Sequence, residues 1–256
     1  MNPLDFAGRG VIVTGGTRGI GAAIARAFLD AGARVLVCGR HGPSTVDPGP
    51  EFFQADVRDP EQAAALVAAA GERFGRVDVV VNNAGGAPAA PAATASPRLH
   101  AKVIELNLIA PLHVSQAANT VMQGQPDGGS IIMIGSVSGD RPSPGTAAYG
   151  AAKAGLHHLA TSLAMEWAPK VRVNSLVVGP VGADVGLVAA GVDPTAVART
   201  VPMGRAATPE DVAQACLLLA SPLAAYVTGA ALAVHGGGEW PGYLAHPGAG
   251  AYPAQK

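Results

Sequence analysis

Short apolar runs alternate with longer amphipathic segments along most of the chain. Apolar runs without polar alternation are typical of strands that a parallel sheet buries on both faces. The pattern predicts strands at residues 10–14, 34–38, 52–55, 77–81, 130–135, 171–178 and 231–234. It predicts helices at residues 20–31, 60–74, 99–122, 146–167 and 209–220, with Asp59 as the N-cap of the second.

This order of elements predicts an α/β fold. Strands that alternate with helices favour a Rossmann-type, doubly wound parallel β-sheet with helices on both faces. No linker or internal repeat interrupts the pattern, so we expect a single domain over residues 1–256. Residues 41–50 and 85–97 are rich in Gly, Pro and Ala and are predicted loops, and residues 236–256 form a Gly/Pro-rich tail.

Composition narrows the class of protein further. Hydrophobic residues make up 49% of the 256 residues and charged residues 14%, which argues against disorder. A formal net charge of -1 without a long basic run argues against nucleic acid or an anionic membrane as a partner. Neither a signal-like apolar segment near the N-terminus nor a membrane-length apolar run is evident, so we expect a cytoplasmic protein.

The two cysteines, Cys38 and Cys216, each lie in an apolar run. We interpret them as free thiols of the core, and a disulfide or a redox pair is the alternative. No Cys-x-x-Cys spacing supports that alternative, and no metal site is predicted.

A glycine-rich turn separates the first predicted strand from the first helix. It reads Gly-x-x-x-Gly-x-Gly from Gly15 to Gly21. Glycines let a pyrophosphate approach the backbone, and a helix N-terminus offers free N–H groups to an anion. An ordinary strand–helix turn is the alternative, and the Gly-Lys-Ser/Thr of a nucleoside triphosphatase is missing. The predicted cofactor contacts here are Gly15, Thr17, Arg18, Gly19, Ile20 and Gly21.

The residues after the second strand indicate which nicotinamide cofactor is bound. Proteins selective for NAD place an acid there to bind the ribose 2′-hydroxyl, but this strand leads into Arg40. A guanidinium suits the 2′-phosphate of NADP, and Arg18 adds a second cation. The sequence therefore predicts NADP(H) over NAD(H), and two solvated surface arginines are the alternative.

Tyr149 and Lys153 lie four residues apart in a predicted helix, so they share one face. Tyrosine is a poor base at pH 7, but a neighbouring ammonium stabilises the phenolate. Tyr149 is then suited to exchange a proton with a carbonyl or alcohol oxygen. Ser136 follows the fifth strand, at the sheet edge where such folds bind ligands, and is suited to donate a hydrogen bond to that oxygen.

With these motifs in order, the chain resembles the short-chain dehydrogenase/reductase family over nearly its whole length. The resemblance rests on the glycine-rich turn, Asn82-Asn83-Ala84-Gly85, and Ser136 with twelve residues between it and Tyr149-x-x-x-Lys153. Further matching segments are Asp56-Val57, Asn107, Gly204-Arg205, Pro209-Glu210-Asp211 and Tyr226-Val227-Thr228-Gly229.

The resemblance implies roles for further residues. Asp56 and Val57 would hold the adenine, and Asn107 would hold a water that relays protons to Lys153, with a structural role as its alternative. Tyr149 and Lys153 would also contact the cofactor. Asn83, Ala84 and Gly85 would line the cofactor cleft. A homotetramer or homodimer is implied through the two long helices, where Ala151, Ala152, Ala154 and Gly155 would permit close approach.

The chain departs from the family pattern after the sixth strand. Val178 replaces a proline and Ala183 replaces the threonine that would bind the carboxamide of the cofactor, although Val181 could still reach it through its backbone. His235 stands where an acid is usual, and we interpret it as a structural position near the subunit contact. The segment after Arg40 lacks a helix that relatives carry.

The substrate pocket is expected from residues 86–97, 137–144 and 180–201, which are mostly small and apolar. An apolar ketone or secondary alcohol is therefore the predicted substrate, with Asp140 and Arg141 at the mouth or merely solvated. Reduction of a 3-oxoacyl thioester is an alternative, but Lys170 and Arg172 are the only basic candidates near the expected carrier-protein surface.

Two other classes of protein remain open at this point. A non-catalytic NADP(H)-binding regulator or scaffold would be favoured by the loss of a catalytic residue, and none is missing. An NADP-dependent epimerase or dehydratase is possible too, but those relatives usually have a longer chain with a separate substrate domain.

Overall fold

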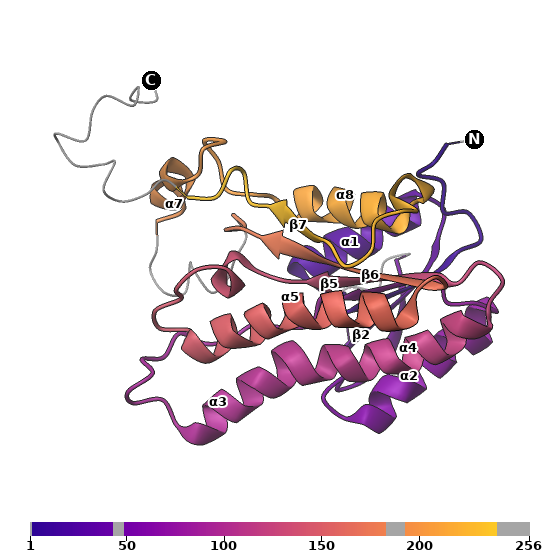
Figure 1. The fold of residues 1–256 in the computed structure, drawn as a ribbon, viewed down its shortest axis with the longest axis horizontal. Coiled ribbons are helices and arrows are strands. Elements are labelled where there is room, and N and C mark those ends of the chain that lie inside the picture. Colours follow the sequence, from indigo (N-terminus) through magenta and orange to yellow (C-terminus); the bar gives the residue numbers. More distant parts are fainter. Residues whose placement is uncertain (1, 43–48, 183–192, 240–256) are drawn as a thin grey trace.

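The computed structural model describes residues 2–42, 49–182 and 193–239 and contains a parallel sheet with the strand order β3-β2-β1-β4-β5-β6-β7 (Figure 1). Every neighbouring pair of strands is parallel. The strands are β1 (Gly10–Thr14), β2 (Arg34–Gly39), β3 (Glu51–Gln54), β4 (Val79–Asn82), β5 (Gly129–Ile134), β6 (Val171–Val178) and β7 (Ala231–Val234). The predicted fold class is confirmed.

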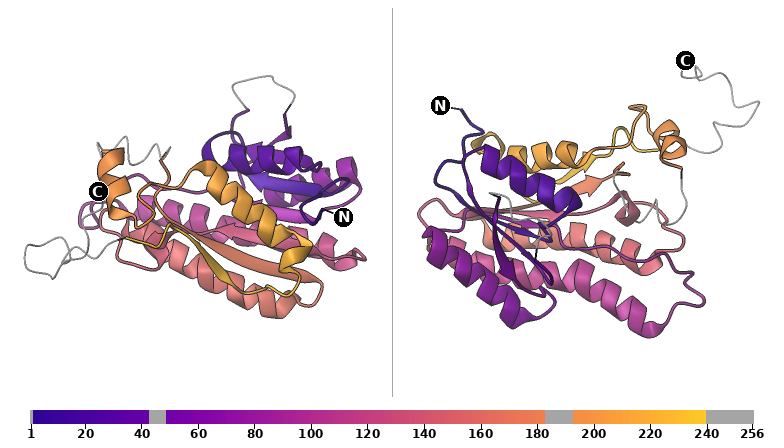
Figure 2. Two further views of the ribbon diagram at one scale, coloured as in Figure 1. Left: turned by 90° about the horizontal axis from the view of Figure 1, so that it is seen from above. Right: turned by 180° about the vertical axis from the view of Figure 1, so that it is seen from behind.

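Helices cover both faces of the sheet (Figure 2). One face packs against α1 (Gly19–Asp30) and α8 (Pro209–Ala220), and the other against α2 (Pro60–Phe74), α4 (Ala110–Gly124) and α5 (Ala147–Trp167). Alternate residues of β1 divide between the two cores: Val11 and Val13 enter the first, and Ile12 enters the second. This division is the geometric consequence of a strand buried on both sides.

The predicted helix over residues 99–122 is longer and less regular than expected. It consists of α3 (Pro97–Ile104), a π-helical segment η1 (Glu105–Ile109) and α4, which follow each other without a break. The sequence did not predict the 3-10 turn η2 (Val137–Gly139) or the helix α7 (Pro194–Thr200), nor the turn that follows α8. A further 3-10 turn, η3 (Pro222–Ala224), follows α8.

Local sequence sets the ends of several helices. The Asp59 carboxylate accepts hydrogen bonds from the N–H groups of Glu61 and Gln62, which confirms it as the N-cap of α2. Gly75 ends that helix in the left-handed conformation, with φ of 75°. Thr208 and Asp211 form a reciprocal capping box at the start of α8.

The amino ends of the strands carry a charged network. The Asp78 carboxylate is 7% exposed and accepts hydrogen bonds from Arg9 Nη1 at 2.8 Å, Arg76 Nε at 2.7 Å and the Gly10 N–H at 2.9 Å. Asp127 joins the two arginines from the solvent side. The charged side chains at the amino ends of the strands therefore stabilise the fold. Ligands of such folds bind at the opposite, carboxyl ends of the strands.

The two cysteine thiols are buried on opposite faces of the sheet, Cys38 against α2 and Cys216 against α1, so they belong to the core as expected. Burial raises the pKa of both thiols, that of Cys38 to about 11. None of the helices described is long and apolar enough to cross a membrane.

Candidate active site

The glycine-rich turn lies at the carboxyl end of β1, where the strand order reverses between β1 and β4. Its glycines are required by close packing. A Cβ at Gly21 would overlap the carbonyl oxygen of Gly15, and a Cβ at Gly16 would lie 2.5 Å from the Val37 side chain. Asn83 fixes the turn from β4, because its Nδ2 donates to the carbonyl oxygens of Thr14 at 2.9 Å and Gly15 at 3.2 Å.

The start of α1 fits a phosphate group. The N-cap residue Arg18 makes no side-chain cap, and the first turn of α1 contains no acid. The amide groups of Gly19, Ile20 and Gly21 therefore keep their hydrogen-bonding capacity and the positive end of the helix dipole for an anion. Gly19, with φ of 53°, leaves open space where a side chain would stand. These residues fit the diphosphate of a dinucleotide cofactor.

Arg18 and Arg40 are both exposed, and among the residues described neither is paired with a carboxylate. Arg40 directly follows β2. A Cβ at Gly39 would lie 3.6 Å from the Thr17 side chain, which shows that the turn and the end of β2 are adjacent. Two guanidinium groups that have no carboxylate partner within the described residues therefore border the place where the second strand ends.

Asp56 is ion-paired within the chain. Its carboxylate receives a bidentate ion pair from Arg58, with Nε at 2.9 Å from Oδ1, and this pair holds the pKa of Asp56 below its usual value. Arg40 contributes to the same lowering from farther away. Val57 is buried beside it. The predicted adenine contact of Asp56 and Val57 would therefore involve a carboxylate that is already neutralised by Arg58.

Lys153 is almost fully buried, with 3% exposed. Its Nζ donates a hydrogen bond to the carbonyl oxygen of Ile134 at 2.7 Å and lies 5.5 Å from the ring centroid of Tyr149. Burial lowers the pKa of Lys153 to about 8. The ammonium thus sits between the end of β5 and the half-buried phenol ring, on the helix face that the four-residue spacing predicted.

Asn107 lies within η1 and is fully buried. Its Oδ1 accepts from the Gly86 N–H at 2.8 Å, and its Nδ2 donates to the carbonyl oxygens of Gly86 and Val103, both at 2.9 Å. A Cβ at Gly85 would lie 2.7 Å from Asn107 Oδ1 and 3.4 Å from Lys153 Nζ, so all three groups meet at one point. The amide of Asn107 holds the loop after β4 beside Lys153.

The Ser136 segment packs onto the start of α5. The Ser136 Oγ accepts a hydrogen bond from the Ser138 N–H at 3.2 Å, which fixes the hydroxyl at the N-cap of η2. Gly150, the neighbour of Tyr149, lets this segment approach, because a Cβ there would lie 2.8 Å from the Ser138 carbonyl oxygen. The structure therefore brings Ser136, Tyr149 and Lys153 onto one local assembly of η2 and α5.

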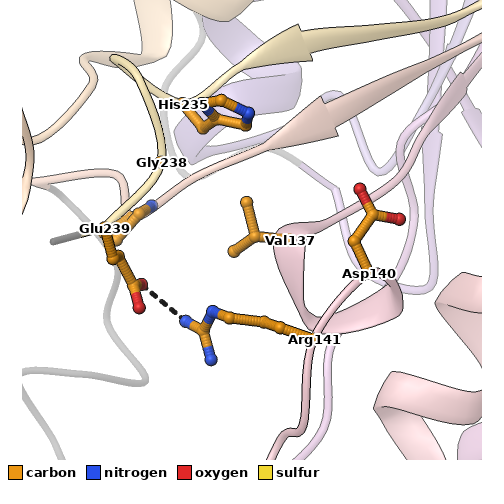
Figure 3. A pocket seen from close by; sticks show the side chains of 7 residues that line it. Val137, Asp140, Arg141, His235, Gly238 and Glu239 are labelled. Carbon is orange, nitrogen blue, oxygen red and sulfur yellow. Dashed lines mark hydrogen bonds and ion pairs between the residues drawn. The ribbon is translucent and has the colours of Figure 1, made fainter. Parts of the chain in front are cut away.

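A cavity of about 130 Å³ that opens to solvent lies next to this assembly (Figure 3). Arg141 and Glu239 form an ion pair of 2.6 Å across it. Asp140 and Arg141 line this pocket, as expected. His235 lines it too, and its expected place near a subunit contact stays a prediction. The lining residues are Val137, Asp140, Arg141, Pro180, His235, Gly238 and Glu239.

Val181 is buried and pairs in an isolated parallel bridge with Ala207. That bridge uses the Pro180 carbonyl and the Gly182 N–H rather than the backbone groups of Val181 itself. Val178 is the last residue of β6, and Ala183 lies outside the described residues, as do positions 183–192 of the expected pocket. No helix lies between β2 and β3 in the residues described there, and residues 43–48 lie outside them.

The small residues of α5 serve mainly to pack the chain against itself. Ala152 is fully buried in the core, and a Cβ at Gly155 would lie 3.2 Å from Leu108 of η1. Ala152 therefore offers no surface to another subunit, whereas the expected subunit contact of the other three small residues stays a prediction. Ala151 and Ala154 are exposed on the outer face of the helix.

Sequence reasoning did not identify His157, Arg58 or Glu239 as parts of this region. For His157 a signal existed: it continues the four-residue spacing of Tyr149 and Lys153 along the same helix face. No local pattern identified the Arg58 pairing, and that of Glu239 depends on contact between distant segments.

Comparison with known proteins agrees with this geometry. A family model described as enoyl-(acyl carrier protein) reductase matches residues 15–239. The chain is 37% identical to a 3alpha-hydroxysteroid dehydrogenase of Mediterraneibacter gnavus, over 88% of this chain and 94% of that protein. It is 39% identical to a cis-4-hydroxycyclohexanecarboxylate dehydrogenase of Sinomonas cyclohexanicum, over 91% of this chain and 97% of that protein.

Among solved structures, the ligand-free aldohexose dehydrogenase of Thermoplasma acidophilum superposes with a TM-score of 0.84 at 30% identity, covering 91% of this chain and 94% of that one. Fold, site and relatives together define an oxidoreductase that uses a nicotinamide cofactor. The chain belongs to the short-chain dehydrogenase/reductase family.

Proposed function

We propose that this protein reduces a cyclic ketone to a secondary alcohol, or catalyses the reverse reaction, with NADP(H) as the cofactor. The observation that carries the proposal is the buried Lys153 ammonium beside the Tyr149 ring, with the Ser136 segment packed on the same helix. The bound nicotinamide supplies or accepts the hydride. The side chains of the protein hold and move the accompanying proton.

Tyr149 is the proton donor to the carbonyl oxygen during reduction. The Lys153 ammonium stabilises the phenolate that remains, because a positive charge nearby favours the ionised form of an acid. Since the Lys153 Nζ is also held by the Ile134 carbonyl, it stays in place while the phenol loses its proton. In alcohol oxidation the same phenolate accepts the proton of the hydroxyl.

Ser136 orients the substrate. Its Oγ accepts from the Ser138 N–H, so its own hydroxyl proton is available for an outside acceptor. A hydrogen bond from this hydroxyl to the substrate oxygen strengthens as negative charge develops there. Asn107 supports the arrangement by fixing Gly86 next to Lys153, and we propose that a water relay to Lys153 starts in this neighbourhood.

The preference for NADP(H) rests on Arg18 and Arg40, which are exposed and free of carboxylate partners in the described structure. An NAD-type acid at the end of β2 is absent from the sequence. We expect Arg40→Gln to weaken NADPH binding about 10- to 100-fold, the size of a lost charged hydrogen bond, and to leave NADH binding unchanged. Fluorescence titration with both cofactors measures this, with Arg26→Gln, an exposed arginine of α1, as the control.

Tighter binding of NADH than of NADPH by the unaltered protein would contradict the cofactor assignment. Equal weakening of both cofactors by Arg40→Gln would show that Arg40 supports the turn rather than the 2′-phosphate.

The proposed substrate follows from the cavity and the relatives. Val137 and Pro180 give the cavity apolar walls, while Arg141 and Glu239 neutralise each other. The hydroxysteroid and hydroxycyclohexanecarboxylate named for two relatives are cyclic secondary alcohols. A carrier-protein substrate is less well supported here, because Lys170 and Arg172 donate to backbone carbonyls of their own chain.

The experiment that tests the function is NADPH oxidation with 4-oxocyclohexanecarboxylate, a 3-oxosteroid, acetoacetyl-CoA and the quinone menadione, each analysed for its reduced product by mass spectrometry. We expect turnover with at least one cyclic ketone. Tight NADPH binding without turnover of any compound would contradict the proposal and favour a non-catalytic binding protein. Turnover restricted to acetoacetyl-CoA would favour the thioester reductase.

We also propose that the protein is a homodimer or homotetramer through the outer faces of α4 and α5. That face of α5 exposes Ala151, Ala154 and Met165, whose side chain is 82% exposed. Light scattering after gel filtration measures the assembly, and Met165→Glu should dissociate it; a monomeric unaltered protein would contradict the proposal.

A further inference from the structure

His157 links the proposed catalytic serine segment to the helix that carries Tyr149 and Lys153. It lies one turn after Lys153 on α5, and its side chain is 11% exposed. Its Nε2 accepts a hydrogen bond from the backbone N–H of Ser136 at 3.4 Å, near the long end of the range. Its Nδ1 lies 3.1 Å from Asp140 Oδ1. The ring therefore holds the segment 136–140 at both of its ends.

Two glycines show how closely the ring fits this segment. A Cβ at Gly135 would overlap the Nε2 of His157, and a Cβ at Gly139 would lie 3.1 Å from its Cε1. The residues on either side of Ser136–Ser138 thus leave room for the imidazole and for nothing larger. Close packing of this kind transmits any displacement of the ring to the backbone that carries Ser136.

The two contacts define one protonation state. Nε2 must be free of a proton to accept from Ser136, so Nδ1 carries the proton and donates to Asp140. Two charged groups face the ring in the described structure: the Asp140 carboxylate, and Lys153 from its own helix. Burial lowers the pKa of His157 most strongly, Lys153 adds to this, and Asp140 opposes it. The neutral ring is the state present near pH 7.

Protonation of Nε2 would place its N–H against the N–H of Ser136. Two donors would then face each other where a donor and an acceptor met before, and the link to Ser136 would be lost. The bond from Nδ1 to Asp140 would remain, because a charged imidazole attracts the carboxylate. The segment would therefore stay attached at Asp140 and become free at Ser136.

We propose that His157 is a positioning residue for Ser136, which orients the serine hydroxyl while neutral and releases it when protonated. This inference rests on the proposed function, because it acts through the role of Ser136. Protonation of His157 should lower kcat at acidic pH. This acidic limb of the pH profile is one that Tyr149 and Lys153 do not produce. Loss of kcat, rather than a change in cofactor affinity, is the expected result of disrupting it.

The test measures kcat from pH 5 to 9 with NADPH and whichever ketone of the four-compound panel is reduced fastest. His157→Leu should lower kcat about tenfold at pH 7, the order expected when a reacting group is misplaced, and lose the acidic limb. His157→Gln keeps an acceptor near Nε2 that cannot be protonated, so it should recover most of kcat and also lack the acidic limb. His158→Leu, an exposed neighbour, is the control and should keep the original profile.

The failure of this proposal is distinguishable from the failure of the proposed function. Persistence of the acidic limb in His157→Gln, or full kcat in His157→Leu, would overturn the role of His157 while Ser136→Ala still lowered kcat to a measurable residual rate. Full kcat in Ser136→Ala would overturn the role of Ser136 itself. In the double variant, His157→Leu should add no further loss to Ser136→Ala, because both act through one hydroxyl.

A measurement on the unaltered protein completes the test, because it requires neither turnover nor a folded His157→Leu variant. Nitrogen-15 NMR of the histidine rings should show His157 protonated at Nδ1 at pH 7, with a pKa below the usual value for histidine. The other tautomer, or a charged ring at pH 7, would overturn the proposal even if none of the four ketones were reduced.

Discussion

At the scale of single residues, the burial of Lys153 lowers its pKa and also lowers the stability of the folded protein. The unfolded chain keeps an ordinary lysine, while burial lowers the pKa in the folded state to about 8. Below pH 8 the folded protein must hold a buried charge. As the pH rises from 8 towards 10.5, the folded state is relieved of that charge before the unfolded state loses its proton, so stability rises.

Lys153→Met should remove this rise. The free energy of unfolding of the unaltered protein, relative to the variant, should increase between pH 7 and 10 by up to about 3 kcal/mol. Urea unfolding at several pH values measures the difference, in which the titrations common to both proteins cancel. Parallel curves would contradict the assignment of a charged, buried Lys153. The same variant should lose turnover at least about 100-fold.

At the scale of elements, two helical glycines should respond in opposite ways to replacement by alanine. A Cβ at Gly21 would overlap the Gly15 carbonyl, so Gly21→Ala should distort the turn and weaken NADPH binding at least about tenfold. Gly71, within α2, has nothing within 4 Å of the Cβ position, so Gly71→Ala should stabilise the protein by about 0.5–1 kcal/mol. Cofactor titration and thermal unfolding of both variants check this pair.

The matched pair excludes a general effect of replacing a helical glycine. If Gly21→Ala bound NADPH normally, the turn would not depend on close backbone packing. If Gly71→Ala were destabilised, the helix would not tolerate the methyl group that the structure leaves room for.

Secondary structure was predictable from the sequence where periodicity was strong. Residues 10–14, 60–74, 171–178, 209–220 and 231–234 were predicted with the observed bounds. The π-helical segment η1 was not, because a helical period does not reveal a single widened turn. The turn η2 and helix α7 are too short to show a periodic pattern.

The residues of the candidate site were predictable in part. Tyr149, Lys153 and the glycine turn follow from local spacing, and the structure packs the segment after Ser136 against the helix that carries the first two. The partner of Asp56 and the cavity contacts of His235 were not predictable. They depend on side-chain geometry and on segments that are distant in sequence, which no local pattern encodes.

At the scale of the whole molecule, the two edges of the sheet have separate tasks. The amino edge carries the Asp78 network, and the carboxyl edge carries the candidate site. Asp78→Ala would leave Arg9 and Arg76 without their buried partner and should cost about 2–3 kcal/mol of stability. Because this edge is remote from the site, kcat/KM per folded molecule should be unchanged.

Thermal unfolding and steady-state kinetics at a temperature where the variant stays folded check this separation. Asp127→Ala, at the solvent side of the same network with 59% of its side chain exposed, is the control and should lose less stability. A large fall in kcat/KM for Asp78→Ala would show that the two edges are coupled.

The most direct test of the account is a comparison of Tyr149→Phe with the unaltered protein in NADPH-dependent ketone reduction. The account predicts that the variant loses at least about 100-fold in kcat/KM, because the proton donor is gone. NADPH affinity should stay within about threefold, and Tyr226→Phe, at a fully exposed tyrosine, should behave as the unaltered protein. Turnover that survives in Tyr149→Phe would contradict the tyrosine–lysine mechanism.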